Sequence, residues 1–281
     1  MELIEYAVDD SVAVITLNRP EKANAQNRDL LIELNTAWQM AASDEDVRVI
    51  VLQANGRHFS AGHDLAGQRP ASAEAKPWTL ADMYDSESEY FFGYSMAWRN
   101  CTKPSIAAVH GKCVAAGLML CWPCDLIIAS DDAEFSDPTA RMGLAGVEYM
   151  AHVWEFGLRK AKEILFRSTA ITAEEARELG MVNKVVPRES LRDEAMAWAK
   201  EIATLNPMMT RLIKRGLNAT ADAMGFSSSL AHHFDIHELA HAVQQSMVAA
   251  GVVERPTNML DHMRSTNADI AAREADDRRS A

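Results

Sequence analysis

The sequence has few cysteines and no long apolar run. Four cysteines in 281 residues are too few for a disulfide scaffold. The most apolar stretch, 114–124, is interrupted by Pro123 and ends at Asp125, well short of the ~18 apolar residues that a membrane span needs. The first five residues include two glutamates and no basic residue, and they lack the basic and apolar regions of a signal peptide. We therefore expect a protein of the reducing cytosol, cytoplasmic and with no membrane partner.

Positive charge is also scarce. The chain has 28 lysines and arginines against 40 aspartates and glutamates, a formal net charge of −12. Such a surface repels phosphate backbones, so we expect no nucleic-acid partner. Any anionic substrate would need a local basic patch. The apolar share of 48% and the charged share of 24% are typical of a globular protein.

The pattern of apolar residues predicts an α/β protein that ends in helices. Short apolar runs bounded by turn residues predict buried strands at 12–17, 47–52, 105–109, 125–129 and 182–186. Helical spacing predicts helices ending at Ser43, over 83–100 and from Ala115, then over 191–205, 210–223 and 227–250. We expect a surface loop at 66–82 and a frayed tail at 269–281. Because strands give way to helices near residue 189, we divide the chain into an α/β core, 1–188, and a helical C-terminal subdomain, 189–281.

The segment His237-Glu238-Leu239-Ala240-His241 matches the H-E-x-x-H pattern. On a helix this spacing places two imidazoles on one face as zinc ligands, with the glutamate as general base. No third histidine follows, and Glu254 lies past the expected helix end. The alternative is a polar helix face at a subunit contact, since four of the nine histidines crowd this helix. We expect no metal here, because a third ligand is lacking.

Cys121-Trp122-Pro123-Cys124 forms a C-x-x-C pattern. In a redox site the first cysteine is activated at a helix N-terminus after a strand, whereas this pair closes an apolar helix. A structural zinc would need a second cysteine pair, and Cys101 and Cys113 lack the spacing. We interpret these cysteines as buried structural residues.

Two loops of small residues, 59–65 and 111–117, each follow a predicted strand. Small residues let a ligand approach backbone N–H groups closely, and a helix N-terminus adds a partial positive charge. Two N–H groups that converge on one oxygen form an oxyanion hole. Each loop alone is equally compatible with a simple tight turn.

Several segments, in order, resemble the crotonase superfamily, also called the enoyl-CoA hydratase/isomerase family. They are NRP at 18–20 with NA at 24–25, FSAGHDL at 59–65, KPSIAAVHGKCVAAG at 103–117 and CDLIIA at 124–129. The segments ITAEEA at 171–176, GMV at 180–182 and VVP at 185–187 fit the same family. The resemblance covers about residues 3 to 250. It implies a crotonase-like spiral of ββα units with a helical C-terminal trimerisation subdomain, and hence a homotrimer or a hexamer.

The resemblance also implies a CoA thioester as substrate, with no separate cofactor. The thioester oxygen would lie between the backbone amides of His63 and Ala116. The substrate-binding residues that it implies are Lys22, Ala23, Ala61, His63, Asp64, Leu65, Ala66 and Ala116. Arg19, Lys22 and Arg57 are candidates for the CoA phosphates and would supply the local basic patch.

The sequence departs from the family at both carboxylates of hydration. One glutamate of the family's hydratases falls two residues after the Gly-rich turn, which is Met119 here. The second follows a proline, and Pro138 is followed by Thr139. Neither side chain can replace a carboxylate in proton transfer. The family's Gly-Gly pair is Ala115-Ala116, which still permits a backbone contact.

Another acid or base must therefore serve if the protein turns over. Glu148, in the loop where other members place acidic residues, is the first candidate, followed by Asp137 and His63 and then His152. A single carboxylate favours isomerisation, hydrolysis or decarboxylation over hydration. We interpret the chain as an acyl-CoA-processing enzyme that stabilises a thioester enolate or oxyanion, with weak standard hydratase activity. The alternatives are a non-catalytic acyl-CoA-binding protein and, third, a metallopeptidase.

Overall fold

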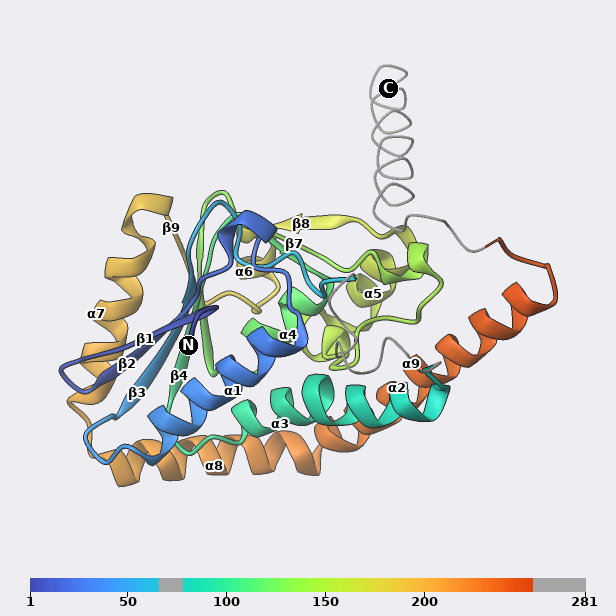
Figure 1. Ribbon diagram of the computed structural model, residues 1–281. Coiled ribbons are helices and arrows are strands. Elements are labelled where there is room, and N and C mark those ends of the chain that lie inside the picture. Colours follow the sequence, from blue (N-terminus) through green and yellow to red (C-terminus); the bar gives the residue numbers. More distant parts are fainter. Residues whose placement is uncertain (66–77, 255–281) are drawn as a thin grey trace, which may run out of the picture.

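Two β-sheets lie at the centre of the structure, a computed structural model that describes residues 1–65 and 78–254 (Figure 1). The larger sheet has the strand order β1-β2-β3-β4-β6-β9, in which β1 runs antiparallel and the others are parallel. Its strands are β1 (Ile4–Asp9), β2 (Val12–Leu17), β3 (Val49–Ala54), β4 (Ser105–Val109), β6 (Leu126–Ser130) and β9 (Lys184–Val186). The smaller sheet joins β5 (Lys112–Val114), β7 (Glu134–Ser136) and β8 (Ala170–Thr172).

The chain alternates between the two sheets. Strand β4 of the larger sheet leads directly into β5 of the smaller one, and β6 leads likewise into β7. Helix α4 (Leu118–Cys121) follows the first of these strand pairs, and α5 (His152–Arg167) follows the second. This repeated strand–strand–helix order is the expected spiral of ββα units, and it brings the ends of successive units to one side of the sheets.

Side chains of β3 alternate between two cores, as the two-residue period of a strand requires. Val49 and Val51 face a core shared with α7 (Leu191–Ala203), whereas Ile50 and Leu52 face the larger core shared with α1 (Arg28–Ser43). Helices thus cover both faces of the larger sheet (Figure 1). Both faces of the central strands β2, β3 and β4 are buried, so these strands are mostly apolar in sequence, whereas the edge strand β1 is largely exposed.

Helices α2 (Leu80–Glu87) and α3 (Tyr94–Arg99) are joined by a π-helical turn, Ser88–Gly93. This stretch runs beside the two long C-terminal helices, α8 (Pro207–Ala223) and α9 (Phe226–Ala249) (Figure 1). Thr79 begins α2 with a capping box to Asp82, so the helix starts three residues before the expected Met83. The remaining helix is α6 (Ala173–Glu178).

Most predicted elements occur, with shifted ends. Strand β3 lies two residues later than expected, and α8 begins at Pro207 because Asn206 caps it. Strand β1, the three-residue strands of the smaller sheet, α5 and α6 were not predicted. Much of the expected loop at 66–82 and the whole tail at 269–281 lie outside the described residues. No described helix is long and apolar enough to span a membrane.

Candidate active site

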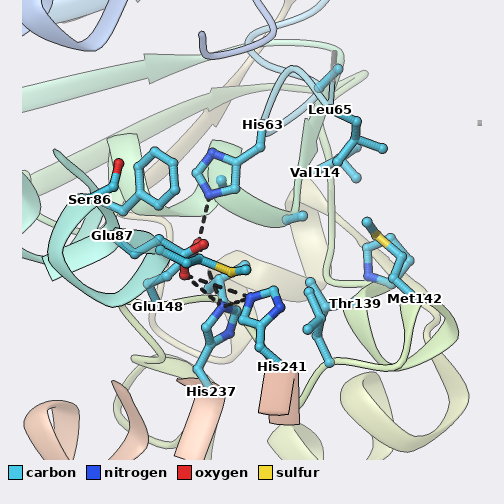
Figure 2. A pocket seen from close by; sticks show the side chains of 18 of the residues that line it. His63, Leu65, Ser86, Glu87, Val114, Thr139, Met142, Glu148, His237 and His241 are labelled. Atoms are coloured by element: carbon cyan, nitrogen blue, oxygen red, sulfur yellow. Dashed lines mark hydrogen bonds and ion pairs between the residues drawn. The ribbon is translucent and has the colours of Figure 1, made fainter. Parts of the chain in front are cut away.

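A cavity of about 440 Å³ opens where the two small-residue loops meet helices α2 and α9 (Figure 2). It gathers residues that are far apart in sequence: His63, Ala116, Thr139, Glu148 and His237 all line it. Its remaining lining is mostly apolar and comes from Ala61, Leu65, Trp78, Met83, Phe91, Val114, Ala115, Pro138, Met142, Leu144 and Val147, with Ser86, Glu87 and His241. An apolar cavity with a few convergent polar groups is the usual form of a small-molecule site.

The two loops touch at Gly62. This residue has φ of +86°, and a Cβ there would lie 2.7 Å from the carbonyl oxygen of Val114 and 3.2 Å from the amide nitrogen of Ala116. Only glycine permits this approach. Hydrogen bonds from Ser60 N to Lys112 O (3.2 Å) and from Val114 N to Ser60 O (3.0 Å) hold the loops together. The backbone at His63 and at Ala116 is thereby brought to one wall of the cavity, which neither loop alone could indicate.

Glu148 lies in the cavity wall and pairs with His63. Its Oε1 is 2.9 Å from His63 Nε2, while Oε2 has no hydrogen-bond partner within the described residues. The His63 ring stacks on Phe91, with centroids 4.0 Å apart. Phe91 belongs to the π-helical turn, a feature that frequently occurs at functional sites. Glu148 is thus fixed in position, and its Oε2 is a buried oxygen that carries no hydrogen bond in the described part of the chain.

A second polar cluster lies on the α2 and α9 side of the cavity (Figure 2). His237 Nδ1 bonds to the carbonyl oxygen of Gly146 at 2.7 Å. Its Nε2 faces His241 Nε2 at 3.1 Å, Glu87 Oε2 at 3.3 Å and Glu148 Oε1 at 3.7 Å. One imidazole therefore connects the cluster to Glu148.

Charge pairing sets the protonation of these groups. Burial alone would raise the pKa of Glu148, but the imidazoles of His63 and His237 lower it below the usual glutamate range. Burial would lower the pKa of His237, but the carboxylates of Glu148 and Glu87 raise it to about 9. Burial and the charge of His237 lower the pKa of His241 to about 4. Near neutral pH the cavity therefore holds an ionised Glu148, a cationic His237 and a neutral His241.

Comparison with known proteins decides the family. The sequence profile of the enoyl-CoA hydratase/isomerase family matches residues 7–254. The chain belongs to this family. "Putative enoyl-CoA hydratase EchA13" of Mycobacterium tuberculosis is 44% identical over 258 residues, which cover 86% of this chain and 81% of that protein.

Solved structures of the family share the crotonase-like fold. A probable enoyl-CoA hydratase from Mycobacterium smegmatis is 52% identical, with a TM-score of 0.84 over 88% of this chain and 98% of that one. An enoyl-CoA hydratase/isomerase from Xanthobacter autotrophicus Py2 is 34% identical, with a TM-score of 0.77 over 85% and 87% of the two chains. The α/β fold with a helical C-terminal region, expected from the resemblance, is confirmed.

Apart from Ala116, the residues expected to bind CoA in this family member lie on two adjacent segments. Ala61 N donates to Ala23 O at 2.9 Å, so the loop at Lys22 runs beside the 61–65 segment. Ala61, His63, Leu65 and Ala116 line the cavity, whereas Lys22, Ala23 and Asp64 lie outside it. Ala66 falls outside the described residues. Their roles in binding stay predictions.

Arg19 holds these two segments together. Its Nη1 bonds to Asp64 Oδ2 at 2.7 Å and to the carbonyl oxygen of Ala25 at 2.8 Å. The Arg19 side chain is largely covered, with 14% exposed. We expected Arg19 among the phosphate ligands, but these two bonds already engage its guanidinium. Lys22 and Arg57 are exposed and stay candidates.

Two of the alternative acid–base candidates are not in the cavity wall. Asp137 and His152 are fully buried and face each other at 3.1 Å. Burial would raise the pKa of Asp137, but its bonds to His152 and Thr139 lower it. Asp137 Oδ1 accepts from the Thr139 hydroxyl at 2.5 Å and from Thr139 N at 3.0 Å. This pair fixes the loop at Thr139 and does not face a bound molecule.

The interpretation of the H-E-x-x-H segment needs correction. His237 and His241 line the cavity, and the alternative of a subunit contact for this helix stays a prediction. The stated lack of a third ligand is wrong, because Glu87 of α2 reaches both histidines. The histidine spacing was visible in the sequence, but nothing in the run Asp85-Ser86-Glu87-Ser88-Glu89 shows which carboxylate turns inward. The three cysteines 113, 121 and 124 are buried, as expected.

Proposed function

We propose that this family member processes an acyl-CoA by stabilising negative charge on the thioester oxygen while Glu148 moves a proton at the acyl chain. The observation that carries the proposal is the contact of the two loops at Gly62, which brings the His63 and Ala116 backbones to the same cavity as Glu148. Backbone donors aimed at an oxyanion are among the largest contributors to such catalysis.

Glu148 suits the role of base in the resting protein. Its lowered pKa keeps it ionised at neutral pH, and its Oε2 is free of hydrogen bonds within the described residues. A weakly basic carboxylate gains little driving force by itself. Proton abstraction next to the thioester therefore depends on stabilisation of the resulting enolate by the loop amides. Isomerisation uses this step directly, because the proton taken from one carbon is returned to another. Hydrolysis would instead use Glu148 to activate a water that attacks the thioester carbon and displaces the CoA thiol, and decarboxylation would form the enolate by loss of CO₂.

Standard hydration of an enoyl-CoA is disfavoured, because the cavity lacks the two carboxylates that this reaction uses. Met119, at the position of one hydratase glutamate, is buried and is not part of the cavity wall. Thr139, at the other, lines the cavity, but its hydroxyl donates to Asp137. Positioned acid–base groups each contribute ~10²–10⁴-fold, so the loss of both leaves little capacity to add water.

A screen of acyl-CoAs tests the proposal. The panel contains crotonyl-CoA together with β,γ-unsaturated, branched, aromatic and β-keto thioesters, with product identification by mass spectrometry. We expect turnover of at least one member and, on crotonyl-CoA, hydration far below the typical ~10 s⁻¹ of enzymes. Rapid hydration of crotonyl-CoA would refute the inference that Met119 and Thr139 replace the two glutamates needed for hydration. Tight acyl-CoA binding measured by calorimetry, without turnover of any member, would favour the non-catalytic alternative.

A further inference from the structure

We propose that Glu87, His237 and His241 form a binding site for a divalent metal ion of the zinc type, on the α2 and α9 side of the cavity. The proposal goes beyond the acyl-CoA chemistry and does not depend on it. The three side chains come from two helices that are about 150 residues apart in sequence. One ligand atom from each lies within 4.8 Å of the others.

The distances between the three ligand atoms suit a metal ion with tetrahedral coordination. Ligands about 2.0–2.1 Å from a tetrahedral Zn²⁺ lie about 3.4 Å from one another. Here His237 Nε2 and His241 Nε2 are 3.1 Å apart, His237 Nε2 and Glu87 Oε2 are 3.3 Å apart, and His241 Nε2 and Glu87 Oε2 are 3.7 Å apart. The existing triangle accepts the ion with shifts of a few tenths of an ångström. Two imidazoles and a carboxylate are also the donor set of catalytic zinc sites that keep a fourth position open.

The surroundings orient these ligands. His237 Nδ1 is held by the carbonyl oxygen of Gly146 at 2.7 Å, which is the usual partner of the non-ligating nitrogen and leaves Nε2 for the metal. His237 and His241 are four residues apart on α9, so helical geometry alone places both rings on one face. Glu87 arrives from α2, immediately before the π-helical turn.

The Glu87 carboxylate lies between the His237 imidazole and the Glu238 carboxyl. Its Oε2 is buried and makes no hydrogen bond within the described residues, although it faces both imidazoles. The Glu148 carboxylate lies close by, with Oε1 3.7 Å from His237 Nε2. In the metal-free protein the protonated His237 ring supplies the positive charge between these carboxylates, and a bound metal ion would supply it instead, with release of that proton. The open side of the ion would face the cavity, because His237 and His241 both line it.

Metal binding by the full chain tests the site directly. The protein is stripped with a chelator, loaded with Zn²⁺, dialysed and analysed by elemental mass spectrometry, all without acyl-CoA. We expect about one zinc per chain, and with Co²⁺ the visible absorption of a tetrahedral site. Affinity is then measured by competition with a chelating indicator. Ligand variants Glu87→Gln and His241→Gln should bind Zn²⁺ at least ~100-fold more weakly, a larger loss than the 10–100-fold typical of outer-shell residues.

His232→Gln is the matched control, since His232 is an exposed histidine on the same helix. It should bind like the wild type. Absence of retained zinc in the wild type would overturn the proposal, as would equal affinity of the wild type, Glu87→Gln and His241→Gln. His241 is only partly buried, so we expect His241→Gln to fold. If Glu87→Gln fails to fold, the zinc affinity of His241→Gln alone tests the site. Because no thioester is present, failure here leaves the acyl-CoA proposal untouched.

Discussion

At the scale of single residues, the charge of the cavity depends on the cationic His237, which lies between the carboxylates of Glu148 and Glu87. His237 has its pKa raised to about 9 by Glu148 and Glu87, against the effect of burial. A group whose folded pKa exceeds its unfolded value stabilises the fold fully below the unfolded pKa and loses that effect as pH rises through the folded pKa. For His237 this window runs from pH 6.5 to about 9.

We therefore expect the free energy of unfolding of the metal-free protein to fall between pH 6.5 and pH 9. The upper limit of the contribution is about 3 kcal/mol. In His237→Gln that part of the fall should vanish, whereas His232→Gln should keep it. Urea unfolding with chelator present, at closely spaced pH values, measures the difference. Parallel curves for the wild type and His237→Gln would show that the imidazole is not charged in the folded state.

His63 should act on Glu148 through its side chain as well as through its backbone amide. Its Nε2 is 2.9 Å from Glu148 Oε1 and helps to lower the pKa of that carboxyl. Replacement by glutamine keeps the amide but removes the imidazole, so the pKa of Glu148 should rise. The acid limb of the pH profile of kcat/KM should then move to higher pH in His63→Gln. An unmoved limb would show that another group controls it.

At the scale of elements, the π-helical turn places Phe91 at the cavity and directly follows Glu87, the last residue of α2. It depends on Gly93, where a Cβ would lie 2.6 Å from the carbonyl oxygen of Ser88. Gly93→Ala should lower the free energy of unfolding by about 1–3 kcal/mol, the usual cost of overpacking. It should also weaken acyl-CoA binding, because the turn must shift.

Gly216→Ala is the matched control for this substitution. Gly216 lies inside α8 with nothing within 4 Å of its Cβ position, so alanine should stabilise the helix by about 0.5–1 kcal/mol. Thermal unfolding of the two variants compares them. Equal effects of the two substitutions would mean that the turn tolerates a side chain.

The sequence predicted an element best where burial produces a nearly unbroken run of apolar residues. Strands β2 and β4 occur at the expected residues, because their apolar side chains all pack into one of two cores and only Thr16 and Ser105 interrupt the apolar run. The strands of the smaller sheet have three residues each, too few for a period to be read. In the site, His63, Ala116 and Glu148 were found through the resemblance. Glu87 was missed, because only the tertiary packing of α2 against α9 turns it inward.

At the scale of the whole molecule, the C-terminal helices leave an apolar face uncovered. Phe226, Leu230 and Phe234 are buried within the chain. On α8, however, Leu212, Ile213 and Leu217 are 48%, 59% and 68% exposed. Faces of this kind usually mark an interaction site, and the expected homotrimer or hexamer would cover it.

Light scattering at micromolar protein should therefore give a mass of three or six chains. The double variant Ile213→Asp with Leu217→Asp should dissociate to the 31.0 kDa chain, because charge is placed in an apolar contact. Ile32→Asp, an exposed apolar position on α1, is the control and should keep the oligomer. If light scattering of the wild type shows only a 31.0 kDa species, the prediction of a trimer or hexamer is wrong.

Glu148 is proposed as the proton-transferring group of an acyl-CoA enzyme, and the kcat of Glu148→Gln tests this role more directly than any other quantity. Glu155→Gln is the control: Glu155 is outside the cavity wall, and burial raises its pKa to about 8, so the substitution resembles its neutral form. On the acyl-CoA found by the screen, Glu148→Gln should lose ~10²-fold or more in kcat with acyl-CoA affinity unchanged, while Glu155→Gln keeps its activity. An unchanged kcat in Glu148→Gln would contradict the account.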